Sequence, residues 1–84
     1  MHKEQEIHGI QAWELQDILV KIGGVCTEEG EYQGNRWKAN FIRLPDYMIG
    51  KLSLCNHQVM FEGDPEVLPE IWRQFELRIF RPGG

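Results

Sequence analysis

Apolar residues recur along the chain with two different periods. Between about Gln11 and Ile22 they are spaced by three and four residues, which predicts an amphipathic helix. Gly23 and Gly24 follow at once and favour the left-handed conformation in which helices often end. The predicted helical stripe consists of Ala12, Leu15, Ile18, Leu19 and Ile22.

From residue 25 to residue 63 the period is two, which indicates strands. Trp37, Ala39 and Phe41 alternate with polar residues, as a half-buried strand requires. The turn pair Gly34-Asn35 precedes this strand, so residues 25–33 are expected to form the preceding arm of a hairpin. Pro45-Asp46 is expected to end the strand.

Two further strands are predicted over residues 48–54 and 58–62. They would be joined through Cys55-Asn56-His57, read as a polar turn. The inward-facing candidates are Leu52, Leu54, Val59 and Phe61.

The period becomes helical again after Asp64-Pro65, a suitable N-cap and first-turn pair. Pro69 favours either an opening turn at residues 65–68 before the regular helix or a kink. Residues 77–81, with Leu77 and Ile79 alternating with Arg78 and Phe80, predict a last strand. The shared helical face consists of Val67, Leu68, Ile71, Trp72 and Phe75.

The resulting element order is α-β-β-β-β-α-β. It predicts an α+β domain in two layers, with an antiparallel sheet of four to five strands and two helices on one face. The 84 residues are expected to form a single domain, with residues 1–6 and 82–84 as flexible termini.

Composition narrows the functional class. The formal charge is −4, with 13 acidic against nine basic residues, which argues against general nucleic-acid binding. No apolar run is long enough to cross a membrane and no signal peptide is apparent, so a cytoplasmic protein is expected. Cys26 and Cys55 are then expected to be reduced thiols.

Apart from the glycines at the C-terminal end, the residues that suggest chemistry are Cys55 and His57. Residues two apart on a strand share a face, so they could supply two metal ligands, but a zinc site needs more. The candidates for the two further zinc ligands are His2, His8 and Cys26, and their spacing matches no recognisable metal site. We therefore expect no metal, no cofactor and no catalytic centre.

The chain as a whole resembles the C-terminal domain of MoaD-related proteins, where it follows a domain similar to the sulfur-carrying small subunit of molybdopterin synthase. The resemblance covers about residues 7–84 and rests on the order of "NFIRLP", "IGKLSL", "VMFEGDPE", "EIWRQF" and the final "RPGG". It implies a two-layer fold like half of the TATA-binding protein, and an association with molybdenum or tungsten cofactor assembly. Here the domain is expected to stand alone.

Sulfur-carrier and ubiquitin-like proteins also end in a strand followed by two glycines. A partner enzyme adenylates their terminal carboxylate, which then becomes a thiocarboxylate or an ester. By this resemblance Gly84 would supply the carboxylate. Gly83 would supply conformational freedom, since glycine reaches conformations closed to other residues. Carrier folds begin with a β-hairpin, however, and here a helix is predicted first.

Two hypotheses remain open. In the first, the protein is a non-catalytic sulfur-carrier-like accessory protein whose partner is an adenylyltransferase or a molybdopterin synthase component. In the second, it is a scaffold module that binds a protein or a ligand, and the tail is incidental. The proposed partner surface, which could also support a homodimer, is the outward side of the sheet with Trp13, Trp37, Arg78 and Arg81.

Overall fold

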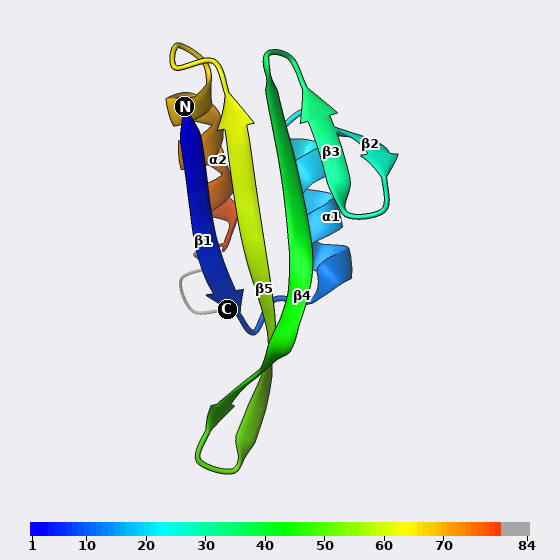
Figure 1. Cartoon of the computed structure of the whole chain (residues 1–84), viewed down its shortest axis with the longest axis vertical. Helices are drawn as coiled ribbons and strands as arrows, with labels where there is room; N and C mark the ends of the chain where they lie inside the picture. Colours follow the sequence, from blue (N-terminus) through cyan, green and yellow to red (C-terminus); the bar gives the residue numbers. More distant parts are fainter. Residues whose placement is uncertain (80–84) are drawn as a thin grey trace.

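The computed structural model describes residues 1–79 and contains five antiparallel strands and two helices. The strands form one sheet in the order β1-β5-β4-β3-β2, and both helices cover the same face (Figure 1). The predicted α+β class and two-layer architecture are therefore confirmed. The elements are β1 (His2–His8), α1 (Ala12–Lys21), β2 (Val25–Glu28), β3 (Glu31–Gly34), β4 (Trp37–Ile49), β5 (Leu52–Gly63) and α2 (Leu68–Ile79).

The core lies between the helices and the inner face of the sheet. The predicted stripe of α1 is buried at Leu15, Ile18 and Leu19, and Gly23 ends the helix with a positive φ of 107°. On the sheet side the alternation of β4 and β5 is confirmed in the upper half of the sheet, because Trp37, Ala39, Val59 and Phe61 are all buried. Burial of apolar surface between these two layers is the main stabilising contribution.

Two glycines leave room for Trp37 in this core. Gly34 and Gly63 are its partners on the neighbouring strands β3 and β5. A Cβ atom at Gly34 would lie 2.1 Å from Cε2 of Trp37, and one at Gly63 would lie 2.8 Å from its Cα. Glycine is therefore required at position 34 against the indole and at position 63 against the backbone of Trp37. The indole also stacks on Phe61 with ring centroids 5.7 Å apart.

The N-terminal residues form a strand that the sequence did not predict. Residues 2–8 pair with residues 56–62 of β5, and the Met1 amino group donates a hydrogen bond to the carbonyl of Gly63 at 2.9 Å. The expectation that residues 1–6 are a flexible terminus is therefore wrong. Ile7 is buried against the helices, and it is the one large apolar residue of an otherwise polar strand.

The β4–β5 hairpin also differs from the prediction. Pro45 and Asp46 do not end β4, because a bulge between Leu44 and Tyr47 accommodates them. The reversal lies instead at Gly50, whose φ is +59°. Cys55-Asn56-His57 lies within β5 and is not a turn, and of the predicted inward residues of this hairpin Leu52 is 67% exposed.

The predicted opening of α2 is confirmed. Asp64 accepts a hydrogen bond from the backbone N–H of Glu66, and its carbonyl accepts from Val67 and Leu68, so a turn precedes the regular helix. The predicted strand at residues 77–81 is wrong over its first part, because α2 continues to Ile79. Its remainder lies outside the described residues, as do residues 82–84. No helix in the part that is described could span a membrane.

Candidate functional site

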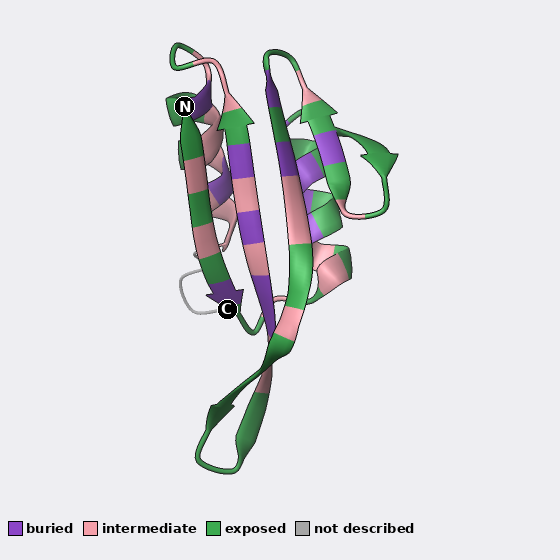
Figure 2. Cartoon of the chain, in the orientation of Figure 1, coloured by how far each residue is buried: buried purple, intermediate pink, exposed green. Residues whose placement is uncertain are grey.

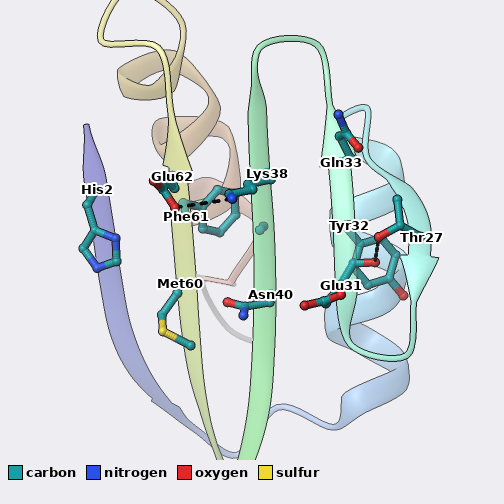
Figure 3. A pocket seen from close by; sticks show the side chains of 11 residues that line it. His2, Thr27, Glu31, Tyr32, Gln33, Lys38, Asn40, Met60, Phe61 and Glu62 are labelled. Carbon is teal, nitrogen blue, oxygen red and sulfur yellow. Dashed lines mark hydrogen bonds and ion pairs between the residues drawn. The ribbon is translucent and has the colours of Figure 1, made fainter.

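Within residues 1–79 one face of the sheet carries no helix, and we call it the open face. On β1, β5 and β4 every second side chain points to it, and most of these side chains are polar. Its upper half contains a shallow hollow of about 350 Å³, shown from close by in Figure 3. Side chains that line the hollow and are labelled in Figure 3 include His2, Glu31, Lys38, Asn40, Met60 and Glu62.

The hollow offers charges of both signs. Lys38 Nζ lies 3.7 Å from Glu62 Oε2 across the β4–β5 pair, and both side chains are largely exposed. Asn40 and Glu31 face each other across the β3–β4 pair. Such a surface can exchange hydrogen bonds with a polar partner, and an exposed ion pair of this kind contributes little to stability.

A second group of polar side chains connects β1 to the base of the β4–β5 hairpin. Glu6 Oε1 accepts a hydrogen bond from Asn56 Nδ2 at 2.7 Å and lies 3.2 Å from His8 Nε2. These two hydrogen bonds, first that from Asn56, lower the pKa of Glu6. His8 in turn stacks on Tyr47, with ring centroids 3.9 Å apart. The network joins the end of β1 to the base of the β4–β5 hairpin.

Cys55 and His57, the sequence candidates for metal ligands, lie on the inner face of β5. His57 is 1% exposed and packs edge-on against Phe41. Burial, followed by the nearby charge of Arg43, lowers the pKa of His57 and favours the neutral ring. Within residues 1–79 no group of three or more His, Cys, Asp or Glu side chains is placed to hold a metal ion.

Cys26 lies on β2, the edge strand farthest from β1, and pairs with Tyr32 of β3. Its thiol is exposed and donates a hydrogen bond to the carbonyl of Glu28 at 3.3 Å. Burial raises the pKa of Tyr32, and interaction with Cys26 raises it further. Neither cysteine is part of a disulfide in the described residues.

The structure describes three of the predicted partner-surface residues, and it places them on three different elements: Trp13 on α1, Trp37 on β4 and Arg78 on α2. Trp13 is 68% exposed on α1, but Trp37 is buried in the core at 5% exposure, so its assignment to a partner surface is wrong. Arg78 is half-buried on α2 and donates to the carbonyl of Gln74 at 3.2 Å. Arg81 and the two tail glycines, Gly83 and Gly84, lie outside the described residues.

The structure instead exposes apolar side chains that sequence reasoning assigned elsewhere. The outer part of the β4–β5 hairpin is coloured as exposed almost throughout in Figure 2. It carries Tyr47, Met48, Ile49 and Leu52, which are 42–67% exposed. The sequence signal for this hairpin is Gly50-Lys51 between two apolar runs. It is a hairpin turn, whereas the periodicity predicts the interior of a strand over residues 48–54.

Comparison with known proteins gives one family. Residues 3–84 match a family model described as archaeal MoaD-like protein. A search of curated proteins found no match. The matched region includes nearly all of the sheet, both helices and the two glycines at positions 83 and 84.

Proposed function

Because the chain belongs to the archaeal MoaD-like protein family, we propose that it is a non-catalytic accessory protein of molybdopterin biosynthesis, for a molybdenum or tungsten cofactor, that carries sulfur on Gly84. The observation that carries the proposal is the extent of the family match, which continues to Gly84 and so includes Gly83-Gly84. A cytoplasmic location is part of the proposal.

The chemistry requires a free α-carboxylate at Gly84. An adenylyltransferase partner would join this carboxylate to the AMP portion of ATP and release pyrophosphate. Sulfide sulfur would then attack the acyl carbon and displace AMP, so that a thiocarboxylate replaces the carboxylate without any change of oxidation state. Gly83 would give the end of the chain the freedom to enter the partner's active site.

The described part of the chain fits the role of a stable carrier body. α2, which leads to the tail, is anchored by Leu68 and Phe75, both 0% exposed. Phe75 contacts the rings of Phe61 and Trp72 at centroid distances of 4.9 and 5.7 Å. The packing of these side chains thus holds α2 against the sheet. The activating chemistry would belong to a partner such as the adenylyltransferase or a molybdopterin synthase component.

A second candidate function is a scaffold module that binds a protein or ligand. It is favoured by the open face, whose hollow and charged side chains lie on the side of the sheet opposite the helices. In that case the tail would have no part in the function.

Removal of Gly83 and Gly84 tests the carrier function against the scaffold function. The truncated protein should bind its partner in a pull-down but fail to support cofactor formation in a reconstituted assay. Partner binding by the truncated protein in the same pull-down serves as the control, because it shows that the shortened chain is still folded. Full cofactor formation by the truncated protein would exclude the carrier function and leave the scaffold.

A further inference from the structure

The outer part of the β4–β5 hairpin extends beyond both helices and the other strands (Figure 1). We call residues 47–54 of this hairpin the apolar ribbon. The pairing of β1 with β5 ends at Asn56, and the pairing of β3 with β4 ends at Asn40. Within residues 1–79 no third strand pairs with the ribbon, so backbone donors and acceptors on both of its edges face solvent.

The cross-strand register sorts the side chains of the ribbon onto two faces. Tyr47 is opposite Leu54 and Ile49 is opposite Leu52, which places these four apolar side chains on one face. Met48 and Ser53 are opposite each other on the other face. Ile49 and Leu52 are 53% and 67% exposed.

This apolar face is continuous with the open face of the sheet. His8, whose side chain points to the open face, stacks on Tyr47 with an angle of 10° between the ring planes. A two-stranded ribbon is marginally stable without further packing, and open strand edges with apolar side chains favour pairing with another chain. The ribbon therefore has both the apolar face and the free backbone groups of an interaction surface.

We propose that the apolar ribbon is a dimer interface, in which the ribbons of two copies of this chain pack antiparallel about a two-fold axis. The four residues at its centre carry no charge, so the same face on both copies can meet without like-charge repulsion. This inference is independent of the glycine tail and of the proposed function.

The charges at the two ends of the ribbon favour a second copy as the occupant. Lys51 is exposed at the tip, and Glu6 is at the base beside Asn56. Lys51 lies in the turn before β5, five residues from Asn56, a span of up to about 17 Å. If two ribbons overlap antiparallel over that length, Lys51 of each copy approaches Glu6 of the other, and the two charges attract.

Sedimentation equilibrium with a matched pair of variants tests the proposal. Ile49→Lys combined with Leu52→Lys places charge on the apolar face, and Met48→Lys places it on the opposite face of the same ribbon at a similar exposure of 59%. At about 100 µM, where a micromolar complex forms, the wild type and the Met48 variant should be dimers. The double variant should be a monomer, with circular dichroism showing that the fold is retained.

Lys51→Glu tests the charge contribution separately. It should raise the dimer Kd by about tenfold at low salt, and added salt should reduce that difference. A monomeric wild type, or a dimer that survives Ile49→Lys with Leu52→Lys, would overturn the proposal. Equal loss of dimer in the Met48 variant would also overturn it, because the interface would not then be the face that carries Tyr47 and Leu54.

Discussion

Replacement of Gly34 by alanine should destabilise the protein because the added methyl group would overlap the side chain of Trp37. The added Cβ would lie 2.1, 2.2 and 2.4 Å from Cε2, Nε1 and Cζ2 of Trp37, where ordinary contacts exceed 3.4 Å. Trp37 is 5% exposed and stacks on Phe61, so the ring has little space in which to move. Either the indole or strand β3 must therefore shift.

The loss of unfolding free energy caused by Gly34→Ala lies between two limits. A local rearrangement that accommodates one extra methyl group in a packed core costs roughly 1–3 kcal/mol. Complete exclusion of a tryptophan that buries about 200 Å² would cost about 5 kcal/mol at ~25 cal/mol per Å². We expect a loss of about 2–4 kcal/mol in the free energy of unfolding, which for a domain of this size lowers the Tm by roughly 8–25 °C.

Urea denaturation of four proteins isolates the contact: the wild type, Gly34→Ala, Trp37→Phe and the double variant. The smaller phenyl ring should make room for the alanine, so the glycine replacement should cost at least about 1 kcal/mol less in the Trp37→Phe background. A Gly34→Ala protein within about 0.5 kcal/mol of wild type, or strict additivity of the two changes, would refute the packing of Trp37 described above.

Two further predictions concern buried side chains. Burial lowers the pKa of His57, so the unfolded chain binds a proton more readily than the folded one; stability should fall as the pH drops below about 6.5, and His57→Gln should make the urea midpoint less sensitive to pH between 7.5 and about 5. An unchanged pH profile in that variant would contradict the prediction. Phe61→Ala should cost about 3–5 kcal/mol by urea denaturation, because Phe61 is 0% exposed between Trp37, Trp72 and Phe75; a cost below about 1 kcal/mol would show that the core is packed differently.

The parts of the fold that follow from local pattern were predictable from the sequence. α1 has a full apolar stripe and a glycine stop, and Asp64-Pro65 opens the turn that leads into α2. β1 was not predictable in this way. Ile7 is its only large apolar residue, and the strand exists because its backbone pairs with β5 and not because of its own propensity.

The errors around β5 and α2 arise from signals that tertiary contacts override. Pro45 lacks an N–H, but it lies in β4 beyond the end of β3, so no partner strand needs that donor and a bulge suffices. Leu77 and Ile79 fit the period of a strand, yet Ile79 also continues the helical stripe of Phe75 by four residues and packs against the core. Periodicity over so few residues does not separate the two structures.

The candidate site was predictable only in part. The tail glycines were visible in the sequence, and the family match includes them. Trp37 looked like a possible surface aromatic because sequence alone does not show that Gly34 and Gly63 flank it on adjacent strands. The exposed hairpin was missed for the converse reason: its apolar residues have the composition of a core strand, and only the ends of β1 and β3 reveal that nothing in the described chain covers them.

The most direct test of the proposed carrier function is the intact mass of the protein after incubation with a sulfur-carrier adenylyltransferase, ATP and sulfide. The starting mass first establishes that Gly84 carries the free carboxylate. The proposal predicts an AMP adduct without sulfide and, with sulfide, the mass increase of one sulfur replacing one oxygen, located at Gly84 by fragmentation. Neither product should form without ATP or after removal of Gly83 and Gly84. An unmodified mass with adenylyltransferases that activate their own carriers in parallel would contradict the proposed function.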